Sequence, residues 1–226
     1  MQAPSAGPYA ERAFEDPVHG REVADFFLHE LLRNGTTTAM VFATVHRDSV
    51  DAIFAAAEKS NMRIISGKVM MDRHCPEWLR DTPESSYDDG KALIERWHGH
   101  GRLAYAVTPR FAPTSSEAQL DVCRRLADEH PGVFIQSHLA ENHDEVAWVK
   151  RLFPSARSYL DVYEHFGLLR PRAVYAHSIH IDDADRARMA ATGSAAAFCP
   201  TSNLFLGSGL FDLGAALIQH LDDRVV

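Results

Sequence analysis

Two histidines, His138 and His177, each follow a short apolar run with the composition of a buried strand, at 132–137 and 173–176. Parallel neighbouring strands lie about 4.8 Å apart. If these runs are neighbours, both imidazoles reach one metal ion with bonds of about 2.0–2.1 Å. The 39 residues between the histidines amount to one βα unit. Either histidine alone is more readily explained as a core residue, but the pair favours a shared metal.

A carboxylate follows the first histidine at three residues' distance, in the string His138-Leu139-Ala140-Glu141. Glu141 there suits a general acid or base that moves a proton from metal-activated water. The competing interpretation is an acidic residue in the first turn of a helix, which the helix dipole favours. An HxxE string alone is a weak motif, so Glu141 is a candidate only in company with the histidines.

Two further polar groups follow apolar runs: Arg110 comes after 102–108, and Thr201-Ser202-Asn203 comes after 194–199. In parallel α/β folds, ligands bind at the carboxyl ends of the strands. A purely structural role for these residues predicts no such bias. The sequence therefore predicts one ligand site at that end of the sheet.

The elements that must position these residues alternate between strand and helix. Strands are expected at 36–45, 62–69, 102–108, 132–138, 173–177 and 194–199, and helices at 20–34, 47–60, 91–99, 115–130, 141–153, 158–169 and 181–192. Residues 72–89 are expected to form a loop, and 209–226 a helix that leads into the start of another strand. This alternation predicts parallel strands with right-handed crossovers. A doubly wound sheet and a (β/α)₈ barrel both fit, although the barrel needs two more units.

Composition limits the classes of binding partner and the cellular location that the sequence suggests. The 226 residues carry a net charge of −8, which argues against nucleic acid and anionic membranes as partners. No apolar run approaches the ~18 residues of a membrane span, and the N-terminus does not resemble a signal peptide. The three cysteines are far apart in sequence. Unpaired cysteines are typical of the cytoplasm, which is the expected location.

Several long strings are similar to the guanine deaminase family, a group of zinc-dependent amidohydrolases. They are LLRNGTTTAMVF (31–42), GKVMMDR (67–73), YAVTPRFAPTSS (105–116), QSHLAEN (136–142), AHSIH (176–180) and FCPTSNLFLGSGLF (198–211). The similarity runs from about residue 20 to the C-terminus in unbroken family order. The last string in particular favours guanine deaminase over amidohydrolases that deaminate or dechlorinate other nitrogen heterocycles.

The resemblance implies a (β/α)₈ barrel of the amidohydrolase type with one catalytic Zn²⁺. His138 and His177 would be zinc ligands on the fifth and sixth strands, and Glu141 would be the proton shuttle. Arg110 would hydrogen-bond a ring carbonyl of the purine, and Phe111 would pack on its ring. The implied reaction is hydrolysis of guanine to xanthine and ammonia, and a homodimer of the intact protein is compatible with the family.

The chain also departs from the family pattern, which has a His-x-His pair on the first barrel strand and an aspartate after the eighth. The one HxH string, His98-Gly99-His100, lies in a glycine-rich turn after a predicted helix, outside the expected site. We therefore expect residues 1–226 to form a partial barrel with strands two to seven, without the first and last strands or a flanking β-sandwich. By itself this chain is expected to be an inactive fragment, and a non-catalytic remnant that binds a ligand or partner is the alternative.

Overall fold

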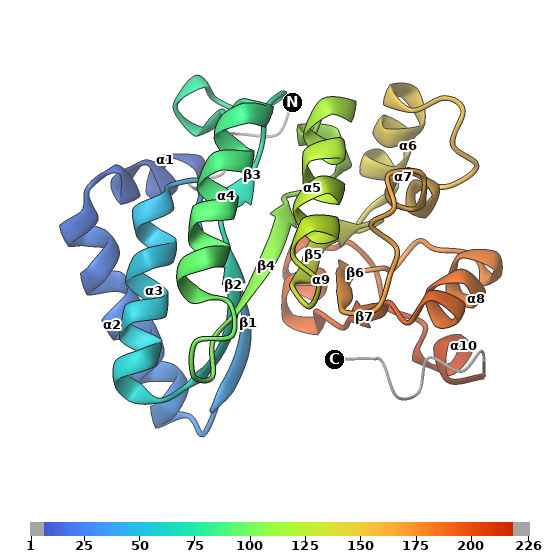
Figure 1. Cartoon of the computed structure of the whole chain (residues 1–226). Coiled ribbons are helices and arrows are strands. Elements are labelled where there is room, and N and C mark those ends of the chain that lie inside the picture. Colours follow the sequence, from blue (N-terminus) through green and yellow to red (C-terminus); the bar gives the residue numbers. More distant parts are fainter. Residues whose placement is uncertain (1–6, 219–226) are drawn as a thin grey trace.

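The computed structural model describes residues 7–218. Seven parallel strands form the sheet: β1 (Thr38–Phe42), β2 (Arg63–Gly67), β3 (Val69–Met70), β4 (Ala104–Pro109), β5 (Phe134–Leu139), β6 (Ala173–His177) and β7 (Ala195–Ala197). Their order is β1-β2-β4-β5-β6-β7, with β3 paired to β4 (Figure 1). A doubly wound sheet would reverse its strand order at a switch point. Because this order follows the chain throughout, the curled sheet is part of a (β/α)₈ barrel.

The run expected as one strand at 62–69 is divided at Lys68 into β2 and β3. The main-chain N–H of Lys68 leaves the ladder and donates to the hydroxyl of Tyr105, at 3.3 Å. Its side chain is buried and forms an ion pair with Asp81. This pair anchors the segment after β3, so the predicted strand is right in position but interrupted.

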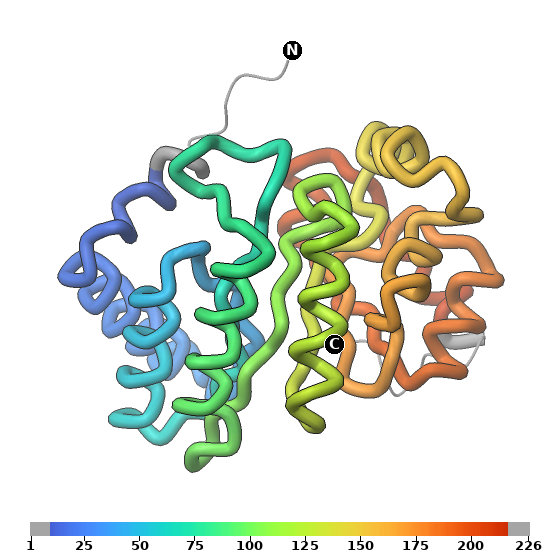
Figure 2. The backbone as a smooth tube through the Cα atoms, turned by 45° about the horizontal axis from the view of Figure 1, so that its top comes forward, coloured from blue at the N-terminus to red at the C-terminus, as the bar shows by residue number. Residues whose placement is uncertain are grey.

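Helices cover the sheet. They are α1 (Gly7–Arg12), α2 (Pro17–Arg33), α3 (Arg47–Ser60), α4 (Pro83–Trp97), α5 (Glu117–Glu129), α6 (His143–Leu152), α7 (Tyr159–His165), α8 (Asp183–Thr192), α9 (Pro200–Leu206) and α10 (Leu213–Ile218), with short 3₁₀ turns η1 (Ala13–Glu15), η2 (Glu77–Leu79) and η3 (Ala112–Thr114). Helices α3, α4 and α5 stand side by side on one face (Figures 1 and 2). No helix within residues 7–218 is long and apolar enough to cross a membrane. The strand expected at the end of the tail lies outside the described residues.

The prediction of a loop over 72–89 is wrong for the second half of this segment, because α4 begins at Pro83. The polar residues that suggested a loop are a helix cap: the Ser85 N–H donates to the Thr82 hydroxyl at 3.1 Å, and the Thr82 N–H donates to the Ser85 hydroxyl at 3.0 Å. Such a capping box satisfies main-chain donors that a helix start leaves unpaired. The first buried positions of α4 are Ser86 and Gly90, and its first fully buried apolar side chain is Leu93, which is why periodicity found the helix late.

The core lies between the sheet and the outer helices. Its largest fully buried side chains include Tyr105, Tyr163 and Tyr175, and the rings of the last two stack at 5.0 Å between centroids. Each buried phenol has a partner, as a hydroxyl in an apolar core requires. The Tyr163 hydroxyl donates to the main-chain oxygen of His138 at 2.8 Å, and that of Tyr175 donates to Leu168 at 2.9 Å. The core therefore contacts the carboxyl end of β5 directly.

Strands β2 and β4 lie in close contact at Gly67. A Cβ atom added there would lie 1.8 Å from the main-chain oxygen of Ala106, which cannot move without disturbing the sheet. Gly20, at the fourth position of α2, provides the opposite case, because the nearest contact to an added Cβ is an ordinary 3.8 Å.

We expect Gly67→Ala to lower the free energy of unfolding by about 1–3 kcal/mol or more, the range for overpacking a well-packed site. Gly20→Ala should raise it by up to about 1 kcal/mol, because alanine favours helix. Thermal or urea unfolding of both variants measures the difference. Equal stability of the two variants would contradict the close approach of β2 and β4.

Candidate active site at the strand ends

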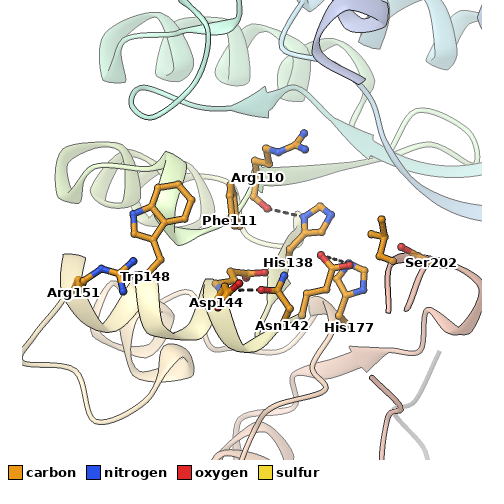
Figure 3. A pocket seen from close by; sticks show the side chains of 12 residues that line it. Arg110, Phe111, His138, Asn142, Asp144, Trp148, Arg151, His177 and Ser202 are labelled. Carbon is orange, nitrogen blue, oxygen red and sulfur yellow. Dashed lines mark hydrogen bonds and ion pairs between the residues drawn. The ribbon is translucent and has the colours of Figure 1, made fainter. Parts of the chain in front are cut away.

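A cleft of about 580 Å³ opens at the carboxyl ends of β4, β5 and β6 (Figure 3). All five residues that the sequence singled out line it: Arg110, Phe111, His138, Glu141 and His177. The structure therefore brings these five side chains together at this edge of the sheet.

The two imidazoles stack across the β5–β6 pair, with 5.3 Å between ring centroids and 27° between ring planes. The strand register alone does not predict this, because it pairs His138 with Ala176 and Leu139 with His177. Neighbours in register share a face of the sheet, so regular pleating would send the two histidines to opposite faces.

The backbone at the end of β6 resolves the conflict. His177 and Ser178 have φ values of 70° and 49°, in the left-handed region that residues other than glycine rarely adopt. This conformation breaks the strand alternation at His177 and brings its ring to the cleft. The Ser178 N–H then donates to the main-chain oxygen of Leu139 at 2.8 Å, which fastens the turn to β5. Backbone strain of this kind concentrates at functional sites.

Each imidazole has its Nδ1 atom committed to an oxygen acceptor. His138 Nδ1 lies 2.8 Å from the main-chain oxygen of Arg110, and His177 Nδ1 lies 2.7 Å from Oδ1 of Asn203. Because these oxygens only accept, the hydrogen of a neutral ring sits on Nδ1 and the lone pair on Nε2. Burial lowers the pKa of His138 to about 4, which keeps that ring neutral. Both rings thus offer Nε2 in the form that binds metals.

Glu141 stands beside this pair. Its Oε2 lies 3.7 Å from Nε2 of His177, and its Oε1 accepts a hydrogen bond from the Ser208 hydroxyl at 3.2 Å. The helix expected from residue 141 begins at His143, with Asn142 as its N-cap. That boundary was wrong, and the correction removes the alternative explanation of Glu141 as a residue of the helix's first turn.

The donor set for a metal is incomplete within residues 7–218, which contain no cluster of three or more His, Cys, Asp or Glu side chains that could hold an ion. The His98-Gly99-His100 string does not supply the missing ligands. His98 Nδ1 accepts from the Tyr105 N–H at 3.1 Å, and His100 pairs with Glu58 at 2.7 Å, at the amino end of β4. The two site histidines fit two positions of a tetrahedral or larger zinc site.

The other wall of the cleft is the segment after β4. The guanidinium of Arg110 is exposed, and the ring of Phe111 meets Trp148 edge to face at 6.1 Å. Behind them, the Ala112 N–H donates to the hydroxyl of Tyr163 at 3.0 Å. The same hydroxyl donates to the main-chain oxygen of His138, so Tyr163 is hydrogen-bonded to both walls of the cleft.

Three side chains at the site escaped the sequence reasoning: Glu145, Trp148 and Ser208. Trp148 and Glu145 lie on α6, and only the packing of that helix beside the cleft reveals them. Ser208 belongs to the 198–211 string, whose similarity to the family implied no role for this residue. The expected polar segment 201–203 does reach the site, through Ser202 at the cleft and Asn203 behind it.

The Amidohydrolase family model matches residues 9–220 of this chain. The chain belongs to the amidohydrolase family. It is 56% identical to the guanine deaminase of Escherichia coli strain K12 over 206 residues, and 47% identical to a probable guanine deaminase of Deinococcus radiodurans over 203 residues. These alignments cover 91% and 90% of this chain but 47% and 46% of the relatives. The chain thus spans about half the length of the curated relatives it matches.

Solved structures of guanine deaminases resemble this chain over the same part of their length. An E. coli guanine deaminase superposes with a TM-score of 0.93 at 55% identity, over 94% of this chain and 49% of the other. A guanine deaminase from C. acetobutylicum with guanine bound gives 0.93 at 31% identity, over 99% and 54%. The expected amidohydrolase barrel, present in part, is confirmed. Triazine hydrolase structures at 20–22% identity share the fold.

The buried carboxyl of Glu145 allows a test of this region that needs no ligand. Only 7% of the residue is exposed, and burial raises its pKa from 4.5 to about 7. The neighbouring groups are the hydroxyl of Tyr159 on α7, which opposes the shift, and the carboxylate of Glu141, which adds to it. The pKa of Glu145 in the folded protein therefore lies above its pKa in the unfolded chain. The contribution of this carboxyl to the free energy of unfolding is fully present below about pH 4.5 and is lost as the pH rises through 7.

Glu145→Gln should therefore melt near the wild-type temperature at pH 5 and above it at pH 8. The rise in pKa from 4.5 to about 7 corresponds to about 3 kcal/mol. Melting curves over this pH range, with exposed Glu84→Gln as the control, measure the effect. Parallel pH profiles for the wild type and Glu145→Gln would show that this carboxyl titrates normally.

Proposed function

We propose that the protein containing this chain is a zinc-dependent guanine deaminase, which hydrolyses guanine to xanthine and ammonia. The observation that carries the proposal is the convergence of His138, His177 and Glu141 on one cleft, with 5.3 Å between the two rings. The similarity to guanine deaminases, one of them solved with guanine bound, supports the choice of substrate.

His138 and His177 would hold Zn²⁺ through their Nε2 atoms. Their Nδ1 hydrogen bonds, to the oxygens of Arg110 and Asn203, fix both rings for this role. In the family pattern a His-x-His pair and an aspartate complete the ligand set, and residues 7–218 do not bring such groups to this pair. When bound, zinc supplies the Lewis acidity that makes water a nucleophile at neutral pH.

Glu141 would carry the proton. Its Oε2 faces the histidine pair, so it can take a proton from the attacking water and deliver it to the amino group on carbon 2 of guanine. The bond between carbon 2 and this nitrogen then breaks and the nitrogen leaves as ammonia. The carbon keeps the water oxygen, and the second water proton moves to ring nitrogen N3, which leaves the new carbonyl of xanthine. The Ser208 hydrogen bond holds the other carboxylate oxygen throughout.

Arg110 and Phe111 would hold the purine. A guanidinium is a planar donor that suits the oxo edge of a purine better than an ammonium does, and an aromatic ring packs on the heterocycle. The cleft volume of about 580 Å³ falls among small-molecule sites, which measure about 300–1,000 Å³.

We also propose a cytoplasmic location and, for the intact protein, a homodimer. The location is supported by three free cysteines, Cys75, Cys123 and Cys199, none of which pairs with another. The dimer rests on the family resemblance alone and is tested by the mass of the purified protein in solution.

The direct test is turnover of guanine by the complete gene product that contains these residues, loaded with zinc. We expect loss of guanine and equimolar appearance of xanthine and ammonia, and loss of activity after chelation. Hydrolysis of an amino- or chlorotriazine without turnover of guanine would assign the protein to another amidohydrolase activity. No turnover of either would favour a remnant that only binds.

Glu141→Gln keeps the side-chain size but cannot accept a proton. We expect kcat to fall by about 10²–10⁴-fold, the contribution of a general acid or base, while zinc content stays near wild type. Glu84→Gln, an exposed change on α4, is the matched control. Wild-type turnover in the Glu141 variant would exclude this carboxylate from the reaction.

Arg110→Ala should raise KM for guanine, because it removes the side chain that would face the oxo edge. A hydrogen bond to a charged group contributes about 1.5–3 kcal/mol, or about 10- to 150-fold. Arg102→Ala, before β4 at the other end of the strand, provides the control. An unchanged KM, or lost zinc in place of lost guanine affinity, would contradict the assignment.

A further inference from the structure

Helix α9 and the turn after it place two polar side chains against the site from outside the cleft. Gly207, with φ of 67°, ends the helix in the left-handed conformation. The Ser208 N–H then donates back to the main-chain oxygen of Asn203 at 2.9 Å. This hydrogen bond joins the two residues into one rigid unit, which lies behind His177 and Glu141; Ser202 of the same helix is visible beside His177 in Figure 3.

Asn203 acts on His177. It is 1% exposed, and its Oδ1 accepts the Nδ1 hydrogen of the imidazole at 2.7 Å. Its Nδ2 atom is also buried and has no hydrogen-bond partner among the described residues. An unpaired buried donor destabilises a fold, so a side chain retained in this state requires an explanation beyond stability.

The explanation lies in the tautomer of His177. Without an acceptor at Nδ1, a neutral imidazole divides between two tautomers, and the form with hydrogen on Nε2 has no lone pair for a metal. An oxygen fixed at Nδ1 removes that form and fixes the ring orientation. Since Oδ1 of Asn203 is the hydrogen-bond partner of this Nδ1 atom, the choice of tautomer depends on residue 203.

Ser208 acts on Glu141. Its hydroxyl donates to Oε1 at 3.2 Å, which leaves Oε2 directed at His177. The main-chain oxygen of Ser208 accepts from Nε2 of His180 at 3.0 Å, so the serine is itself held in place. A glutamate has three rotatable bonds, and this contact restricts it to the rotamer that faces the histidine pair.

We propose that Asn203 and Ser208 are positioning residues: Asn203 fixes the metal-binding tautomer of His177, and Ser208 fixes the rotamer of Glu141. The inference rests on the proposed function and explains why polar residues of the 198–211 string reach the site. Neither side chain is assigned a contact with substrate or metal. Their variants should therefore separate metal affinity from turnover.

The test of Asn203 is zinc affinity, measured by competition with a chromophoric chelator in the complete gene product. Asn203→Leu keeps the approximate size but removes the acceptor, and we expect affinity to fall about 10- to 100-fold. Asn203→Asp keeps an oxygen at Nδ1 and should bind zinc within about threefold of wild type or more tightly. Thr201→Ala, exposed on the same helix, should change nothing.

Wild-type zinc affinity in Asn203→Leu would overturn the assignment. So would an equal loss in Asn203→Leu and Asn203→Asp, because that pattern indicates packing and not an acceptor. If the leucine variant fails to fold, a loss of zinc affinity in Asn203→Asp would still overturn the assignment. Zinc affinity needs no substrate, so this result stands or falls separately from guanine turnover.

The role of Ser208 is tested by measuring kcat, zinc affinity and KM for guanine separately. Ser208→Ala should lower kcat by about tenfold or more, the value of a hydrogen bond to a charged group, while zinc affinity and KM stay near wild type. Ser208→Thr keeps the hydroxyl and should restore most of kcat. Unchanged kcat in the alanine variant, or a loss of kcat with loss of zinc, would contradict the role.

Discussion

The pairing of β5 with β6 is the constraint on which the site depends. These strands run parallel over five register pairs, and this contact brings two chain segments 39 residues apart within reach of one ligand. The pairing alone is insufficient, because pleating would turn His138 and His177 to opposite faces. The left-handed turn at His177 and Ser178 corrects the direction, at a cost of about 1–3 kcal/mol per strained residue. The Ser178–Leu139 and His177–Asn203 hydrogen bonds hold this turn in place.

Further contacts connect the two walls of the cleft, the segment after β4 and the histidine pair on β5 and β6. The main-chain oxygen of Arg110 orients His138, while the side chain of the same residue lies on the opposite wall. Buried Tyr163 bonds both the His138 oxygen and the Ala112 N–H. A displacement of either wall therefore moves the other, so the position of the Arg110 wall and the orientation of the His138 ring are coupled through the backbone. The helices outside the sheet matter to the chemistry because one of them, α7, carries this tyrosine.

Sequence patterns predicted the strands well, because buried parallel strands are continuous apolar runs between helices. They also predicted which polar residues gather at the strand ends. They failed where side-chain hydrogen bonds fix the start of a helix. The cap at Thr82 starts α4 earlier in the chain than predicted, and the cap at Asn142 starts α6 later than predicted. Alternation along β6 could not reveal the turn at His177, since positive φ has no signature in a non-glycine residue. Asn203 and Ser208 act across the fold on residues 26 and 67 positions away, a distance that spacing cannot detect.

His138 and His177 would hold one metal ion together, each through its Nε2 atom. Anomalous diffraction at the zinc edge, from crystals of the complete gene product, tests this arrangement most directly. We expect one strong peak in the cleft, about 2.0–2.1 Å from both Nε2 atoms, with both Nδ1 atoms still bonded to the oxygens of Arg110 and Asn203. A peak bound to only one of these rings, bound through Nδ1, or located away from the cleft would contradict it.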